Sequence, residues 1–143
     1  MAAVDKSITI KAPPEKIWDN VKDPNGWPNW FEGASTPKSV DGDGDVGTTV
    51  ELTMSVANLP LPSRLTVSEI DPGKLWRGDF ESPGLAEGHM LFTYMPMGPR
   101  TKLSFHIEAD LKGAAKVAEG MVARSFADMA DKTLQNVKVM AEG

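Results

Sequence analysis

The two histidines of this chain, His89 and His106, are the first residues to consider for chemistry. They are too few to form a zinc site of three histidines. By alternation in an expected strand, His106 shares a face with Lys102 and Glu108, so we expect it to face water. His89 follows Gly88 at the start of another expected strand, where we expect a pocket between the sheet and a helix to open. We therefore keep His89 as a candidate ligand-binding residue.

The segment Asp41–Gly47 matches two ligand-binding patterns only superficially. Its glycines satisfy G-x-G-x-x-G, but the segment precedes an expected strand instead of following one and opening a helix. Asp41, Asp43 and Asp45 begin like a calcium loop, yet Val46 stands where glycine is required and Leu52 where a bidentate glutamate is required. We interpret the segment as a solvated turn and predict no metal and no cofactor.

Few polar side chains are candidates for hydrogen-bonding a ligand or transferring protons inside the molecule. Tyr94 is the strongest, because a buried hydroxyl needs a partner that a ligand carbonyl or hydroxyl could supply. Glu69 shares a face with inward-facing neighbours by alternation, whereas Arg77, Asp79 and Glu81 are expected on the outer face as a solvated ladder. No Ser-His-Asp order is recognisable, so no catalytic residue is assigned and enzymatic activity stays open.

Composition narrows the class of protein. The chain has 143 residues, 15 basic and 20 acidic side chains, a net charge of −5 and no cysteine. This balance argues against nucleic acid as a partner and against an anionic membrane surface. The absence of cysteine removes disulfides and thiolate sites. No signal peptide or membrane-spanning run is visible, so we expect a cytoplasmic protein without integral membrane association. A homodimer is left open.

Alternating apolar and polar residues predict several strands in one domain over residues 1–143. Pro14–Val21 is typical of a helix opened by proline, and Trp27–Phe31 of a short helical turn packed onto the core. Turn residues separate the alternating segments and predict an antiparallel meander. The expected strands cover residues 7–12, 47–57, 64–70, 75–81, 90–94 and 102–109, with breaks at 41–45, 59–62, 71–73, 82–84 and 95–99.

A helix is expected from about Gly113 to Ala141, without interruption and ~42 Å long. Its first half is rich in glycine and alanine, including Ala118 and Gly120, whereas its second half carries Phe126 and other large residues. A curved sheet must cover its apolar face, and this helix is the one long element available for that. We predict that the second half forms solid core and that the slender first half roofs a pocket. The alternative is that alanine here is simply a good helix former facing solvent.

The order of these segments resembles the START-like, or SRPBCC, superfamily of polyketide cyclase/dehydrase type. The resemblance is carried by residues 8–18, by Trp27-Pro28-Asn29-Trp30, by Val46-Gly47-Thr48, by Leu75-Trp76-Arg77-Gly78, and by Gly98–Thr101 with Leu103. It implies an α+β helix-grip fold, in which a curved antiparallel sheet surrounds a long C-terminal helix. It also implies a deep hydrophobic pocket between sheet and helix, without fixing a ligand, since members of the superfamily include carriers, receptors, lipid-transfer modules and cyclases.

Carried over by position, the resemblance places apolar and aromatic side chains around that pocket. The expected ligand-binding residues are Met54, Val56, Leu59, Leu65, Val67, Trp76, Phe80, His89, Met90, Phe92, Tyr94, Phe105 and Met121. Some of these residues could equally be core residues that only pack against their neighbours. Leu59 lies in Asn58-Leu59-Pro60-Leu61, which partly matches the Gly-Leu-Pro-Ala gate loop of related plant hormone receptors. We expect this segment to close the pocket or contact a partner, or to be a rigid turn resting on the helix.

Three functions follow as hypotheses. The first is binding or transport of a hydrophobic small molecule or lipid in the internal cavity. The second is a polyketide cyclase or dehydratase acting in the same cavity, which needs inward polar groups within hydrogen-bond reach of each other. The third is a protein-interaction module that uses the 59–62 segment, which predicts a filled pocket with an exposed apolar tip.

Overall fold

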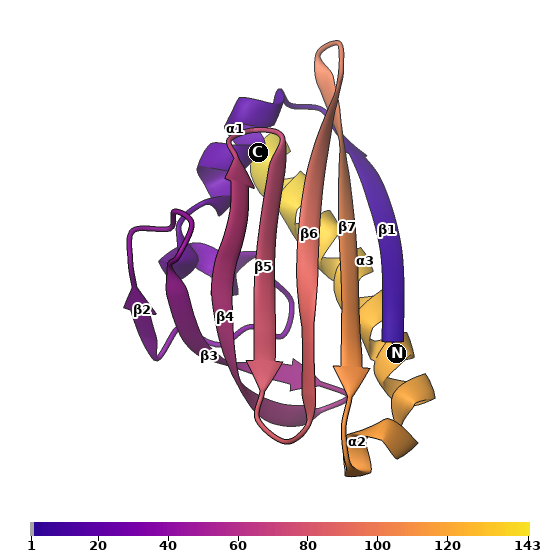
Figure 1. The fold of residues 1–143 in the computed structure, drawn as a ribbon. Helices are drawn as coiled ribbons and strands as arrows, with labels where there is room; N and C mark the ends of the chain where they lie inside the picture. The colour runs from indigo at the N-terminus through magenta and orange to yellow at the C-terminus, as the bar shows by residue number, and fades with distance from the viewer. Residues whose placement is uncertain (1) are drawn as a thin grey trace.

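A curved antiparallel sheet of seven strands holds one long helix against its concave face in the computed structural model, which describes residues 2–143 (Figure 1). The strands lie in the order β1-β7-β6-β5-β4-β3-β2. This is the helix-grip arrangement that the sequence predicted. The elements are β1 (Ala2–Ile10), α1 (Pro14–Val21), the 3-10 helix η1 (Pro24–Asn29), β2 (Ser39–Asp41), β3 (Thr49–Val56), β4 (Leu59–Asp71), β5 (Leu75–Ser82), β6 (Ala86–Met97), β7 (Arg100–Leu111), α2 (Ala114–Val117) and α3 (Glu119–Glu142).

Alternation along the strands decides which side chains enter the core. In β7 the buried residues are every second one, from Thr101 through Phe105 to Ala109. Met90, Phe92 and the other inward residues of β6 are buried in the same way. Because side chains of a strand point to opposite faces in turn, this pattern alone divides the sheet into an apolar concave face and a polar convex face. The predicted alternation is confirmed for both strands.

The expected break at residues 59–62 is wrong. Leu59 to Pro62 form the start of β4, and the chain turns instead at Ala57 and Asn58, whose φ angles of 53° and 64° make a tight two-residue hairpin. Both prolines are tolerated because this part of β4 pairs with β3, while the pairing with β5 begins only at Arg64. The expected turn at 95–99 is likewise shorter, since β6 runs to Met97 and β7 begins at Arg100.

A bulge in β4 overturns the expected inward position of Glu69. The register with β5 shifts between Val67 and Glu69, so that Ser68 is the extra residue of the bulge. One extra residue reverses the side-chain alternation beyond it. Glu69 is therefore exposed, and Ile70 packs against the core in its place.

The C-terminal helix differs from the single uninterrupted helix that we expected. It is broken at Ala118 into the four-residue α2 and the 24-residue α3, which spans about 36 Å. Polar contacts fix α3 along its second half: the Thr133 hydroxyl accepts from the Glu32 amide at 3.1 Å, and the Asn136 amide donates to the Trp30 carbonyl at 3.1 Å. The half of the helix that carries large side chains is therefore also the half that is hydrogen-bonded to the segment after η1.

Candidate functional site

An apolar cavity of about 260 Å³ lies between the concave face of the sheet and the start of the C-terminal helices. Five strands, β3 to β7, contribute large residues to its walls, and α2 with the first turns of α3 forms its roof. The lining residues are Trp27, Phe31, Leu52, Met54, Val56, Ala57, Leu59, Leu61, Ser63, Leu65, Phe80, Ser82, Leu85, Ala86, Met90, Ile107, Leu111, Ala114, Ala115, Ala118, Met121, Val122, Phe126 and Met129.

The cavity exists because its roof is too slender to fill the trough. Ala114, Ala115 and Ala118 line it from above and carry only a methyl group each. Farther along α3, Leu134 and Val137 are almost completely buried and pack against the sheet without such a gap. Protein interiors normally pack at crystal-like density, so the change in side-chain size along one helix suffices to leave a hollow end and a filled end.

An aromatic wall closes the inner end of the cavity. Trp27 and Phe31, from η1 and the residues after it, line the cavity and contact the aromatic core beyond. Phe31 meets Phe105 edge-on at a ring separation of 6.2 Å, and Phe105 stacks on Phe92 at 4.3 Å. The short turn that the sequence placed on the core therefore divides the trough in two.

A second, much smaller cavity of about 20 Å³ lies behind this wall, and Tyr94 lines it together with Trp18 and Trp30. The indole Nε1 of Trp30, a residue that also lines this cavity, is buried with no hydrogen-bond partner within residues 2–143. The space is sufficient for one water molecule. Burial raises the pKa of the Tyr94 hydroxyl far above its usual range, so this group stays neutral and able to donate.

Two serines are the polar groups among the residues that line the large cavity. The Oγ atoms of Ser63 and Ser82 lie 2.8 Å apart, and the Ser63 hydroxyl donates to the Leu61 carbonyl at 3.0 Å. Ser82 must then donate to Ser63, so both hydroxyl protons are used within the protein. The lone pairs that remain can accept a hydrogen bond from a ligand hydroxyl or amide N–H, although the pair contributes almost none of the cavity surface, which is nearly all apolar.

The mouth of the cavity lies where its lining residues reach the surface. Leu59 at the start of β4 is 61% exposed and Met121 in α3 is 53% exposed, although both line the cavity. Val117 at the end of α2, close to Met121 in sequence, is also exposed. The β3–β4 hairpin and the helical roof thus form two sides of one opening.

The structure separates the expected site residues into four groups. Most line the large cavity: Met54, Val56, Leu59, Leu65, Phe80, Met90 and Met121. Trp76, Phe92 and Tyr94 line the small one, and Val67 and Phe105 are nearly fully buried in the core. The expected position of His89 near the cavity is wrong. β6 begins at Ala86, so alternation directs the His89 side chain to the convex face. Ser63 and Ser82 were missed because both lie where the sequence suggested that strands end.

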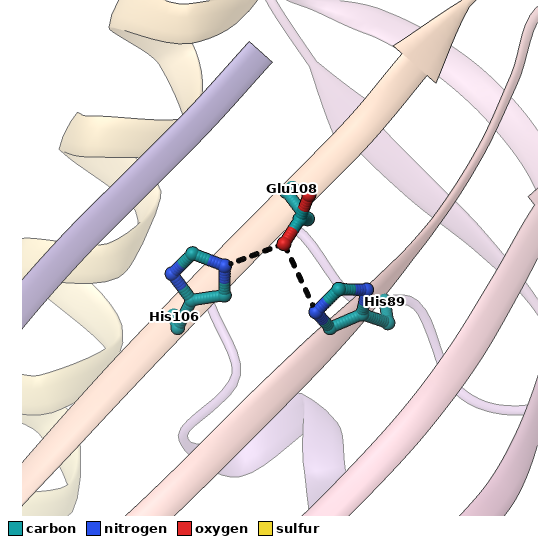
Figure 2. Close-up of side chains that lie close together, drawn as sticks. All are labelled: His89, His106 and Glu108. Carbon is teal, nitrogen blue, oxygen red and sulfur yellow. Dashed lines mark hydrogen bonds and ion pairs between the residues drawn. The ribbon is translucent and has the colours of Figure 1, made fainter. Parts of the chain in front are cut away.

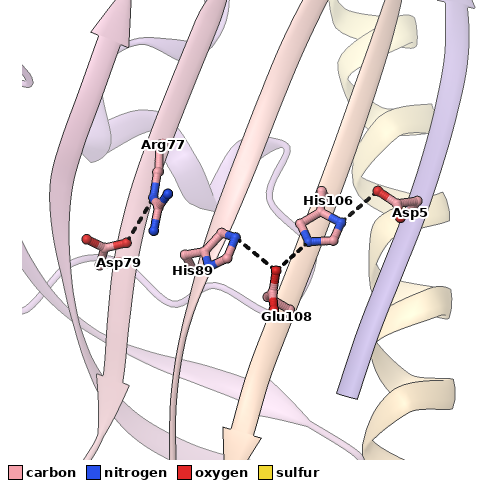
Figure 3. A network of polar contacts seen from close by, with 6 residues as sticks. All are labelled: Asp5, Arg77, Asp79, His89, His106 and Glu108. Atoms are coloured by element: carbon pink, nitrogen blue, oxygen red, sulfur yellow. Dashed lines mark hydrogen bonds and ion pairs between the residues drawn. The ribbon is translucent and has the colours of Figure 1, made fainter. Parts of the chain in front are cut away.

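Polar residues of the convex face form two groups: Arg77 with Asp79, and a chain of contacts that runs from His89 through Glu108 and His106 to Asp5 (Figure 3). Arg77 Nε donates to Asp79 Oδ1 at 3.2 Å, as expected for an outer ladder. His106 lies between Glu108 and Asp5, with Nε2 at 3.0 Å from Glu108 Oε1 and Nδ1 at 2.7 Å from Asp5 Oδ1. The hydrogen bond with Glu108, and then that with Asp5, raises the pKa of His106 above its usual value.

Comparison with known proteins gives a family and several similar folds. The family described as "Polyketide cyclase / dehydrase and lipid transport" matches residues 1–142. No curated protein matches. The Zhui aromatase/cyclase of Streptomyces sp. R1128 is similar over 98% of this chain and 93% of its own, with a TM-score of 0.81 and 18% identity.

Two further solved structures share the fold. A START superfamily protein from Mycobacterium smegmatis has a TM-score of 0.76 and 15% identity over 98% of this chain and 99% of its own. Truncated norcoclaurine synthase from Thalictrum flavum has a TM-score of 0.72 and 20% identity over 99% of this chain and 94% of its own. None of the helices within residues 2–143 is long and apolar enough to cross a bilayer.

Proposed function

The chain belongs to the polyketide cyclase/dehydrase and lipid transport family, and we propose that it binds a hydrophobic small molecule in the cavity under α2 and the start of α3. The observation that carries the proposal is the apolar cavity of about 260 Å³, enclosed by sheet and helix and open at an apolar rim. Its size is close to the lower end of small-molecule sites, which begin at about 300 Å³.

The chemistry of the lining favours binding over catalysis. Within residues 2–143, the side chains around the cavity are apolar except for Ser63 and Ser82. General acid–base catalysis works best with a group whose pKa lies near the working pH, and a serine hydroxyl is far from that range. The imidazoles of His89 and His106 lie on the opposite face of the sheet, so neither reaches the cavity.

The serine pair adds a preference to the proposal. A mostly apolar ligand that carries one hydroxyl would bury its hydrocarbon against Met54, Phe80 and Met90 and donate to the pair. Burying that hydroxyl without a partner would cost about 1–3 kcal/mol, so the pair selects for a ligand with a donor in this position. We therefore propose a hydroxylated hydrophobic molecule, such as a phenol or a sterol-like alcohol, as the ligand class.

The amphiphilic fluorescent probe 1-anilinonaphthalene-8-sulfonate tests the proposal, because its apolar rings can enter the cavity while its sulfonate stays at the open mouth. We expect saturable binding at one site per chain. Ala118→Phe places a large side chain in the roof and should weaken probe binding at least tenfold. Val139→Phe is the matched control, because Val139 is an exposed residue of α3, the helix that follows Ala118, and lies outside the cavity lining. Equal binding by wild type and Ala118→Phe would refute the proposed site.

Native mass spectrometry of protein purified from its own host would identify the class of ligand directly. A co-purified hydroxylated hydrophobic molecule supports the proposal, and its loss in Ala118→Phe would place it in the cavity. The same experiment tests the expectation of a homodimer through the mass of the intact species. A cytoplasmic location and the lack of a nucleic acid partner also stay predictions, which cell fractionation and a nucleic acid binding assay would check.

Polyketide cyclisation or dehydration in the same cavity is the alternative function, and the family description supports it. A cyclase would bind a linear poly-β-ketone and release a ring product, lighter by one water molecule for each aldol addition that is followed by dehydration. Incubating the protein with such a chain and measuring product mass separates the two functions. Turnover that Ala118→Phe abolishes and Val139→Phe retains would favour the enzyme over the carrier.

A further inference from the structure

We propose that the convex face of the sheet binds a divalent transition-metal ion of the Zn²⁺ type through His89, His106 and Glu108 (Figure 2). This site is separate from the cavity, which lies on the other face of the same strands. Two imidazoles and one carboxylate form a donor set that zinc accepts in proteins, with the remaining coordination positions left to water.

The distances among the three side chains suit a shared ion. Glu108 Oε1 lies 3.2 Å from His89 Nε2 and 3.0 Å from His106 Nε2. One ligand atom of each residue lies within 4.8 Å of those of the other two. Zinc bonds of about 2.0–2.1 Å in tetrahedral geometry separate neighbouring ligand atoms by about 3.3 Å. Small side-chain rotations would therefore bring all three around one ion.

The sheet itself holds the ligands in this arrangement. His89 of β6 and Glu108 of β7 are directly paired residues, and His106 precedes Glu108 by two positions on the same face. Gly88 allows the strands to approach closely here, since a Cβ at that position would lie 2.0 Å from the Glu108 carbonyl oxygen. Ligands on two paired interior strands are more precisely positioned than ligands on loops.

Asp5 supports the proposed ligands through a contact with the far nitrogen of His106. His106 presents Nε2 to Glu108 and Nδ1 to Asp5 of β1, at 2.7 Å (Figure 3). A carboxylate on the far nitrogen of a histidine fixes its tautomer and ring orientation and strengthens it as a metal ligand. The Nδ1–H of His106 would donate to Asp5, which leaves Nε2 free for the ion.

Charge and access also favour a cation. Asp5 and Glu108 bring two negative charges, whereas the charge of Arg77 is paired with Asp79. The proposed ligand side chains are neither buried nor fully exposed, at 23–28% of their surface. A hydrated ion can reach them from solvent, and the carboxylates would balance its double charge.

Titration of the metal-free, tag-free full chain with Co²⁺ tests the site, because its visible absorption reports coordination geometry. We expect saturation at one ion per chain, displacement by Zn²⁺, and a shift of both histidine ring signals in NMR spectra. His89→Gln and Glu108→Gln should each weaken binding by on the order of 100-fold, and Asp5→Asn by about 10–100-fold. Glu69→Gln is the matched control, since Glu69 is an exposed carboxylate of the same sheet outside the cluster.

Two results would overturn the proposal. One is the absence of saturable Co²⁺ or Zn²⁺ binding by the wild-type chain at millimolar ion. The other is an affinity of His89→Gln equal to that of wild type, which would place the ion elsewhere. Circular dichroism and probe binding in the cavity show whether each variant is folded. If Glu108→Gln fails to fold, His89→Gln and Asp5→Asn still decide the outcome.

Discussion

The two ends of the trough between sheet and helix are built from the same strands and the same helix, yet one is hollow and the other is filled. At the filled end, Phe92 and Phe105 stack, and Leu134 and Val137 of α3 are buried in the same core. At the hollow end, strand residues of comparable size face Ala115 and Ala118. The sheet therefore does not decide where the cavity lies; the size of the side chains on the helix does.

The helix is also hydrogen-bonded to distant segments at the filled end. Thr133 and Asn136 bond to the segment after η1, and Glu142 accepts from the Lys11 amide. The roof over the cavity is instead interrupted at Ala118 and rimmed by exposed apolar residues. A region with few buried contacts opens at lower free energy than a packed core, so ligand entry would use the hollow end.

Truncation at each end should give the largest contrast. Phe105→Ala removes a fully buried ring from the filled end and should destabilise the fold by about 3–5 kcal/mol. Met54→Ala at the hollow end, where the side chain already borders a void, should cost less than about 2 kcal/mol. Urea unfolding measures both. Equal losses would mean that the hollow end contributes as much packing as the filled end.

Removing one hydroxyl of the Ser63–Ser82 pair should change the ligand preference of the hollow end. Ser82→Ala deletes one member of the serine pair, so 1-naphthol should lose about 0.5–1.5 kcal/mol of binding free energy, about 2- to 13-fold. Naphthalene, which lacks the hydroxyl, should bind the variant as well as wild type or slightly better. Isothermal titration calorimetry with both molecules checks this, and a parallel loss for both would contradict a hydroxyl-specific role.

Stiffening the roof should stabilise it modestly. Gly120 in α3 has open space where a Cβ would stand, so Gly120→Ala should raise the free energy of unfolding by about 0.5–1 kcal/mol. Gly84→Ala is the matched control, because it also meets no neighbour but has a φ of +75°, and it should destabilise. Thermal unfolding compares the two. A loss of stability in Gly120→Ala would show that the roof is not helical at this position.

Loss of the contacts that Glu142 makes with Lys11 and Lys138 at the filled end should produce the smallest effect on stability, and that effect should depend on pH. The Lys11 amide and then the Lys138 ammonium hold the pKa of Glu142 below its usual range. A lowered folded pKa gives stability that is present above the unfolded pKa of about 4.3 and is lost as pH falls through the folded value. Glu142→Gln should therefore be slightly less stable than wild type at pH 7, with the difference disappearing toward pH 3. A difference that stays constant would exclude this carboxylate as its source.

Local patterns were sufficient for the face of most strand residues. Leu65, Met90 and Phe105 face inward because alternation is a property of the extended backbone and needs no knowledge of neighbours. Proline at position 14 and the cluster Trp27–Phe31 marked the early helices for similarly local reasons. The uneven composition of the C-terminal helix predicted which end of the trough would be hollow.

Pairing between distant segments decided the rest. The bulge that turns Glu69 outward depends on the register of β4 with β5, and the meeting of Ser63 with Ser82 depends on how far those strands continue. His89 and Glu108 lie 19 positions apart in the sequence and become neighbours only through the register of β6 with β7. A sequence states which face a side chain takes, whereas the register and length of strand pairing determine which side chains on that face touch.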